Sequence, residues 1–252
     1  MQWTWAAASC RGTSHVQAGT RCQDAHSVSI AHGDAQQLVA VLCDGAGSAQ
    51  LGGQGAALTT RCMSQQALAY FRIHCHHPSD EDVLAWVENT RNKISELASS
   101  RRLTPRDFAT TLILVLSNAT ETLVIHVGDG SVVLRDAVTQ RWQALSWPAH
   151  GEYASSTNFI TDAPDAVVRI ERCDGPTSSI VAFTDGLERL ALNFAEKIAH
   201  APFFSGIVAP LDASLASGRD PSLSAQLAAY LDGKAVNDRT DDDKTLMIAV
   251  LR

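Results

Sequence analysis

The sequence predicts an α+β protein in which two mainly antiparallel sheets carry helices on their outer sides. Short apolar segments of strand length follow one another with turn residues between them, and helical patterns fall into two blocks. A doubly wound parallel sheet would instead place a helix after each strand. Apolar segments are spread evenly over the 252 residues without a Pro-, Gly- or Ser-rich linker. We therefore expect residues 1–252 to form a single domain.

The first helical block follows three predicted strands. Three segments have the apolar and β-branched composition of strands: residues 3–9, 25–31 and 37–43. A glycine-rich loop then leads into a helix expected over residues 54–71. A second helix is expected to end near residue 99, with Ser79 as its N-cap because three acidic residues follow it.

The second half of the chain returns to strands. Four short segments separated by turn residues predict a meander: residues 110–116, 122–127, 131–135 and 142–145. Residues 146–163 are polar and predict a loop. Strands are expected again over residues 166–170, 179–184 and 245–251. Between the last two, residues 188–231 have helical patterns, which we expect to be broken at Pro202, Pro210 and Pro221.

Charge and cysteine content exclude several classes of protein. The formal net charge is −7 and no long basic block is present, which argues against binding to nucleic acid. Six cysteines occur without a C-x-x-C pair, as is typical of reduced thiols in a cytosolic protein. The N-terminus has no signal-peptide pattern, and no apolar run reaches the ~18 residues that span a membrane. We expect a soluble, cytoplasmic protein that binds no membrane.

Predicted strands repeatedly end in aspartate. Asp44-Gly45, Asp129-Gly130 and Asp185-Gly186 each follow an apolar strand, and the run that contains Asp242 precedes the last strand. Since apolar strands are interior, their ends mark the rim of the core, and several carboxylates can converge there. Crowded carboxylates are unfavourable unless a cation compensates their charge. Oxygen ligands suit Mg²⁺, Mn²⁺ or Ca²⁺ rather than zinc. The alternative is that each Asp-Gly pair only makes a turn.

Six motifs, in this order, resemble the metal-dependent serine/threonine protein phosphatases of type 2C, the PPM family, and most closely its compact bacterial branch. The motifs span nearly the whole chain and are Gln23-Asp24-Ala25, the run from Val41 to Ser48, the run from Asp107 to Leu112, His126–Gly130, Phe183–Leu187 and Asp242–Thr245. The resemblance implies a four-layer α/β/β/α sandwich with helix pairs outside the two sheets. It also implies a site for two Mn²⁺ or Mg²⁺ ions between the sheets.

The resemblance assigns roles to individual residues. Asp44 would bridge both metals and Gly45 would offer its carbonyl, while Asp185 and Asp242 would bind the metal on the far side. Asp24 would hold metal-bound waters. Asp129 would lie nearby with a mainly structural or hydrogen-bonding role, because Arg189 stands where the family often has an aspartate for a third metal.

The chain also departs from the family. The arginine that grips the substrate phosphate in many members is replaced by Gly19, and Arg21 or His15 is a candidate substitute. The acidic residue usual before Asp24 is Gln23, which is still expected to accept a hydrogen bond from water. The histidine that follows Asp-Gly in animal members is replaced by Ala46, so metal-bound water or His26 would supply the proton.

The expected activity is hydrolysis of phosphoserine or phosphothreonine by a water that bridges two cations. The partner would be a phosphorylated protein that is the substrate of a serine/threonine kinase. The missing arginine motivates one alternative, a pseudophosphatase that binds phosphoproteins without turnover. A third possibility is a phosphatase of a small phosphorylated metabolite. The tract from His74 to His77 has the composition of a transition-metal site, but its position before Pro78 favours a helix end.

Overall fold

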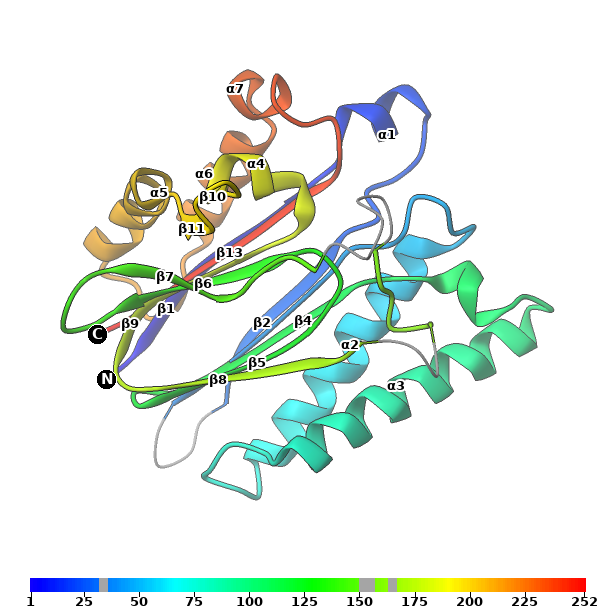
Figure 1. Cartoon of the computed structure of the whole chain (residues 1–252), viewed down its shortest axis with the longest axis horizontal. Helices are drawn as coiled ribbons and strands as arrows, with labels where there is room; N and C mark the ends of the chain where they lie inside the picture. The colour runs from blue at the N-terminus through cyan, green and yellow to red at the C-terminus, as the bar shows by residue number, and fades with distance from the viewer. Residues whose placement is uncertain (32–35, 150–156, 163–166) are drawn as a thin grey trace.

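The computed structural model describes residues 1–31, 36–149, 157–162 and 167–252. Within these residues two large sheets face each other, with α2 (Gly52–Phe71) and α3 (Asp80–Ser100) on one outer side and α5 (Ala201–Ala213) and α6 (Pro221–Leu231) on the other (Figure 1). This is the predicted four-layer α+β sandwich. No helix in the described ranges is long and apolar enough to cross a membrane.

The six-stranded sheet contains strands from both ends of the chain. Its order is β12 (Gly218–Arg219), β1 (Trp3–Cys10), β13 (Lys244–Leu251), β9 (Thr177–Phe183), β6 (Ser131–Asp136) and β7 (Trp142–Ser146). Neighbouring strands are antiparallel except β12, which runs parallel to β1. β1 pairs with β13 along its whole length, from Trp3 opposite Leu251 to Cys10 opposite Lys244.

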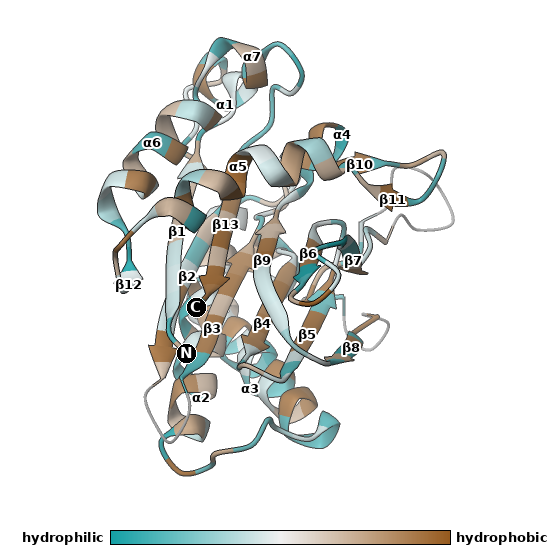
Figure 2. Cartoon of the chain, turned by 90° about the vertical axis from the view of Figure 1, so that its left-hand side faces the viewer, coloured by the Kyte–Doolittle hydropathy of each residue, from teal (hydrophilic) through white to brown (hydrophobic). Residues whose placement is uncertain are grey.

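The five-stranded sheet is antiparallel throughout. Its order is β2 (Ala25–Ala31), β3 (Gln37–Cys43), β4 (Leu112–Ser117), β5 (Glu121–Val127) and β8 (Arg169–Asp174). Every residue of β3 and β4 is buried, because these central strands face the other sheet on one side and α2 on the other. Figure 2 shows hydrophobic colouring along β3, β4 and β13.

Shorter elements connect the layers. They are α1 (Thr13–Gln17), the 3-10 helices η1 (Pro105–Phe108) and η2 (Asp185–Leu187), α4 (Glu188–Ala191), the strand pair β10 (Leu192–Asn193) and β11 (Ile198–Ala199), and α7 (Lys234–Asn237). The predicted cap of α3 is confirmed, since the Ser79 hydroxyl accepts from the Asp82 amide at 3.2 Å and the Asp82 carboxylate accepts from the Ser79 amide at 3.0 Å. Such a reciprocal pair satisfies two amides that have no partner within the helix.

Apolar side chains from both sheets form the layer between them. Trp3, Leu38, Leu42 and Ile113 are among its buried members. Burial of one side chain of this size stabilises the folded state by about 1.5–3 kcal/mol. This burial holds the two sheets in a fixed relation, so residues at the ends of their strands have defined positions.

Two predictions of local structure are wrong. The expected meander is divided between the sheets, because β4 pairs with β5 in one sheet and β6 pairs with β7 in the other. The chain crosses between them at Gly128, whose φ of +110° suits glycine. Pro210 lies inside α5 instead of ending it. Burial of the apolar side chains of α5 offsets the loss of about 3 kcal/mol that an internal proline causes.

Other predicted boundaries differ by a few residues. The strand predicted at 166–170 corresponds to β8 (Arg169–Asp174). The first residue of the predicted segment, residue 166, lies outside the described part of the chain. The predicted loop at 146–163 also falls partly outside it. The helical block expected over 188–231 additionally contains the short strands β10, β11 and β12.

Candidate active site

Three aspartates from distant parts of the sequence line one cavity. Asp44 follows β3, Asp185 follows β9, and Asp242 precedes β13. They lie around a cavity of about 320 Å³, which Asp129 and His15 also line. The ends of strands from both sheets therefore bring together the carboxylates that the sequence pattern singled out.

The backbone around Asp44 is fixed by the two residues that precede β4. The Asp44 amide donates to the Thr111 hydroxyl at 2.9 Å, and the Asp44 carbonyl accepts from the Thr111 amide at 2.8 Å and the Thr110 hydroxyl at 2.7 Å. A Cβ at Gly45 would overlap the backbone of Gly52 at the start of α2. Only glycine allows this approach, so the start of α2 packs directly against the Asp44 turn.

A second glycine brings the other two aspartates together. A Cβ at Gly186 would overlap the carbonyl oxygen of Asp243. The turn that carries Asp185 therefore packs directly on the segment that carries Asp242. The two segments are also joined by the Thr245 amide, which donates to the Thr184 hydroxyl at 3.0 Å.

Asp24 lies beside this cluster and is held by two hydroxyls. Its Oδ2 accepts from Thr184 Oγ1 at 2.9 Å and from Thr245 Oγ1 at 2.7 Å. The side chain is not among the described residues that line the cavity, but its charge acts on Asp44. Asp24 thus lies next to the cluster without lining the cavity.

Burial and mutual repulsion shift the protonation of these acids. Burial raises the pKa of Asp24 to about 6, against the lowering effect of its hydroxyl hydrogen bonds. Burial, with help from Asp129 and Asp242, raises the pKa of Asp185 to about 7. Burial raises the pKa of Asp44 well above its ordinary value, and the neighbouring acids add to the shift. Each shift means that negative charge is disfavoured here unless a cation is present.

Divalent cations fit this cluster. Oδ1 of Asp24 and Oδ1 of Asp185 are buried and have no hydrogen-bonding partner among the described residues. Burying a carboxylate oxygen without a hydrogen bond is unfavourable. Carboxylate oxygens are also the hard ligands that Mg²⁺ and Mn²⁺ accept. Within the same residues, no three His, Cys, Asp or Glu side chains already surround one metal position. Mg²⁺ does not require such a cage, because it usually binds one or two carboxylates and keeps several waters.

One acidic residue of this region was not predicted from the sequence. Glu188 begins α4, only 9% exposed, and burial together with Asp129 and Asp185 raises its pKa to about 8. An acid in the first turn of a helix is commonplace, so only the three-residue spacing from Asp185 could have indicated it. Asp129, which also lines the cavity, accepts from the Thr157 hydroxyl at 2.5 Å.

The two candidate phosphate-binding residues lie in different places. His15 is the one Lys, Arg or His side chain among the described residues that line the cavity. Its Nδ1 is 2.9 Å from Oδ1 of Asp243, an ion-pair distance without hydrogen-bond alignment. Arg21 is exposed and does not line the cavity. The structure therefore brings His15, and not Arg21, to the aspartates.

Two further expectations change with the structure. His26 lies outside the described lining of the cavity, with Nδ1 2.7 Å from the Ser9 hydroxyl, so it does not face a substrate there. The Gln23 amide nitrogen, in the orientation that suits its neighbours, donates to the carbonyls of Gly45 at 2.9 Å and Ala46 at 3.3 Å. Through this nitrogen Gln23 is a donor to the Gly45 turn, while its amide oxygen is still expected to accept a hydrogen bond from water.

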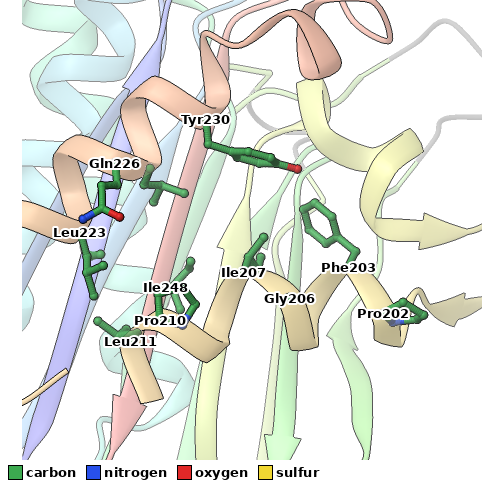
Figure 3. A pocket seen from close by; sticks show the side chains of 12 residues that line it. Pro202, Phe203, Gly206, Ile207, Pro210, Leu211, Leu223, Gln226, Tyr230 and Ile248 are labelled. Atoms are coloured by element: carbon green, nitrogen blue, oxygen red, sulfur yellow. The ribbon is translucent and has the colours of Figure 1, made fainter. Parts of the chain in front are cut away.

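A second cavity has a different character. It lies between α5 and α6, has a volume of about 470 Å³, and is lined by apolar side chains such as Phe203, Ile207 and Leu223 (Figure 3). The described residues that line it include no carboxylate, histidine or cysteine. Of these two cavities, the acidic one is lined by described residues able to bind a metal or act on a phosphate.

Comparisons with known proteins agree with this geometry. The family model described as protein phosphatase 2C matches residues 11–232. Serine/threonine-protein phosphatase 3 of Escherichia coli (strain K12) is 40% identical over 258 residues, covering 99% of each chain.

Solved structures show the same fold. Serine/threonine phosphatase Stp1 from Staphylococcus aureus has a TM-score of 0.63 at 16% identity, covering 98% of this chain and 94% of that one. The catalytic domain of the serine threonine protein phosphatase PstP, in complex with two manganese ions, has a TM-score of 0.65 at 15% identity, covering 99% and 98%. The strand-end aspartates, the two facing sheets and the match over residues 11–232 lead to one conclusion: the chain belongs to the protein phosphatase 2C family.

Proposed function

We propose that Asp44, Asp185 and Asp242 hold two Mn²⁺ or Mg²⁺ ions with which this protein hydrolyses phosphoserine and phosphothreonine in protein substrates. As a member of the protein phosphatase 2C family, the chain is a metal-dependent serine/threonine protein phosphatase. The observation that carries the residue assignment is the convergence of these carboxylates, from the ends of β3 and β9 and the start of β13, on one cavity.

The residues around the cavity have different roles in this proposal. Asp44 and the Gly45 carbonyl oxygen would help to hold the ions, and Asp24 would accept a hydrogen bond from water at the site. Divalent cations bound there would lower the pKa of water at the site, so that a nucleophile would be available at neutral pH. His15 is placed to bind the substrate phosphate, because it is the one Lys, Arg or His side chain among the described residues that line the cavity. Asp129 shapes the cavity wall through its bond to Thr157.

The substrate is inferred to be a phosphoprotein produced by a serine/threonine kinase. The net charge of −7 favours neither nucleic acid nor an anionic membrane as partner, and we place the protein in the cytoplasm. We further infer that residues 1–252 act as one catalytic domain, because β1 and β13, from opposite ends of the chain, share the central part of one sheet.

The test is phosphate release from a phosphothreonine peptide and from an aryl phosphate, with Mn²⁺, Mg²⁺ or EDTA. The wild type should release phosphate from both with either metal and from neither with EDTA. Asp44→Asn, Asp185→Asn and Asp242→Asn should each abolish release, whereas Asp174→Asn, a change at an exposed end of β8, should not. Full activity in Asp44→Asn would refute the assignment.

The same assay separates the two alternatives. A pseudophosphatase would bind the phosphopeptide tightly but release no phosphate at saturating Mn²⁺. A phosphatase of a small metabolite would turn over small phosphate esters much faster than phosphopeptides.

A further inference from the structure

We propose that Thr245, Ser9 and His26 form a hydrogen-bond chain of fixed direction that orients Asp24, with His26 held in its Nδ1–H tautomer at the far end. These three are positioning residues, because the described lining of the cavity includes none of them. The inference rests on the proposed function in one respect, namely that Asp24 serves the metal site.

The contacts form one continuous path. Thr245 Oγ1 is 2.7 Å from Asp24 Oδ2, Ser9 Oγ is 2.6 Å from Thr245 Oγ1, and His26 Nδ1 is 2.7 Å from Ser9 Oγ. All three distances are in the range of good hydrogen bonds. Ser9 and Thr245 lie directly opposite each other in the pairing of β1 with β13, whereas His26 belongs to β2 in the other sheet. The path therefore joins the two sheets behind the acidic cavity.

Counting protons fixes the direction of the path. An ionised carboxylate only accepts, so Thr245 must use its single hydroxyl proton for Asp24. The Thr245 oxygen then accepts from the Ser9 hydroxyl. The single proton of that hydroxyl is therefore used in this bond. The Ser9 oxygen must in turn accept from His26, and this requires a proton on Nδ1.

Thr184 obeys the same rule. Its hydroxyl donates to Asp24 Oδ2 at 2.9 Å and accepts from the Thr245 amide at 3.0 Å. An amide can only donate, so the proton of Thr184 is free for Asp24. Both hydroxyls that contact Oδ2 of Asp24 therefore donate to it. This agrees with the direction derived for the path from His26 to Asp24.

The consequence falls on the other oxygen of Asp24. With Oδ2 taken by two hydroxyls, Oδ1 is buried and has no partner among the described residues. Rotation of the carboxylate would break both hydroxyl bonds, so Oδ1 keeps its orientation. It can then accept a hydrogen bond from water at the metal site without prior rearrangement. Residues that orient metal-site groups in this way commonly affect metal affinity about 10–100-fold.

The first experiment measures the tautomer of His26 in the metal-free protein at pH 8 by long-range ¹H–¹⁵N NMR. The expected result is the Nδ1–H form in the wild type and an increased share of the Nε2–H form in Ser9→Ala. An Nε2–H tautomer in the wild type would overturn the proposal. This measurement needs neither metal nor activity, so its result does not depend on the proposed function.

The second experiment measures Mn²⁺ affinity by calorimetry. Thr245→Val removes the hydroxyl at nearly constant shape and should weaken binding about tenfold, whereas Thr245→Ser should stay within about twofold of the wild type. The matched control is Thr122→Val, because Thr122 is also fully buried in a strand and hydrogen-bonded to a hydroxyl, that of Ser117 at 2.7 Å. It should leave Mn²⁺ affinity unchanged.

The outcomes are distinguishable. Equal Mn²⁺ affinity in Thr245→Val and the wild type would refute the orienting role, and so would equal losses in Thr245→Val and Thr122→Val. If Thr245→Val does not fold, Ser9→Ala carries the same test. If the wild type binds no Mn²⁺, the proposed function fails, while the His26 tautomer still decides the direction of the chain.

Discussion

The Asp243 carboxylate accepts a hydrogen bond from the backbone amide of Gln23 at 2.5 Å. Its other oxygen accepts from the Gly12 amide at 2.6 Å. One buried side chain beside Asp242 therefore ties down the segment that leads to Asp24 and the segment that follows β1. The three parts of the chain meet at the acidic cavity through this single carboxylate.

Asp243→Ala should lower both stability and Mn²⁺ affinity, because two backbone amides lose a charged acceptor. A hydrogen bond to a charged group contributes about 1.5–3 kcal/mol, so a loss of several kcal/mol is expected in urea unfolding. Asp241→Ala removes the same charge at an exposed neighbouring position and should change stability by about 0.5 kcal/mol or less. Similar losses in the two variants would show that charge, and not these two bonds, is responsible.

The stabilisation that Mn²⁺ gives should increase with pH. The pKa values of Asp24 and Asp185 rise to about 6 and about 7 on folding. An acid whose pKa is raised in the folded state favours folding below its unfolded pKa, and this contribution is lost as pH rises through the folded pKa. The metal-free protein therefore loses stability from these groups between about pH 4 and pH 7, and bound cations replace the lost protons. Thermal melts at pH 5, 6, 7 and 8 with EDTA or Mn²⁺ measure the difference; a shift in Tm that does not change with pH would contradict it.

Gly186→Ala should impair metal binding through the backbone. The new Cβ would overlap the carbonyl of Asp243, which forces apart the segments of Asp185 and Asp242. Overpacking of this kind destabilises proteins by about 1–3 kcal/mol. Gly206→Ala is the control, because a Cβ there meets nothing within 4 Å; an added methyl group in α5 should stabilise by about 0.5–1 kcal/mol. Unfolding and Mn²⁺ titration of both variants test the contrast, which fails if Gly186→Ala binds Mn²⁺ normally.

His15→Ala should raise KM for a phosphopeptide about tenfold, the effect of losing one charge-assisted hydrogen bond of about 1.5 kcal/mol. Arg21→Ala should leave KM unchanged, since Arg21 is exposed and outside the described lining of the cavity. Steady-state kinetics at saturating Mn²⁺ compares the two. The reverse result would assign phosphate binding to Arg21.

Strands with a strong local signal could be predicted from the sequence. The bounds of β2 and β3 agree with the segments 25–31 and 37–43, because apolar and β-branched residues end sharply at turn residues. The strand-end position of Asp44 and Asp185 was visible for the same reason. Order along the chain also identified the family, since six weak motifs in sequence carry more information than any one of them.

Relations between distant residues could not be predicted in this way. The assignment of β5 and β6 to different sheets depends on which strands become neighbours, and local pattern does not encode that choice. The burial of Glu188 could not be predicted, because an acidic residue in the first turn of a helix is ordinarily exposed. The bonds from Asp243 to Gly12 and Gln23 span more than two hundred positions, so nothing local indicates them.

The pairing of β1 with β13 has a consequence for synthesis of the protein. β13 lies between β1 and β9 in the six-stranded sheet, yet it is translated after every other strand, together with Asp242 just before it. A ribosome-bound chain that ends before residue 242 thus has neither the third carboxylate nor the strand that completes this sheet. Under the proposed assignment, a chain that ends before residue 242 lacks one metal-binding carboxylate as well as β13, so it is not expected to release phosphate.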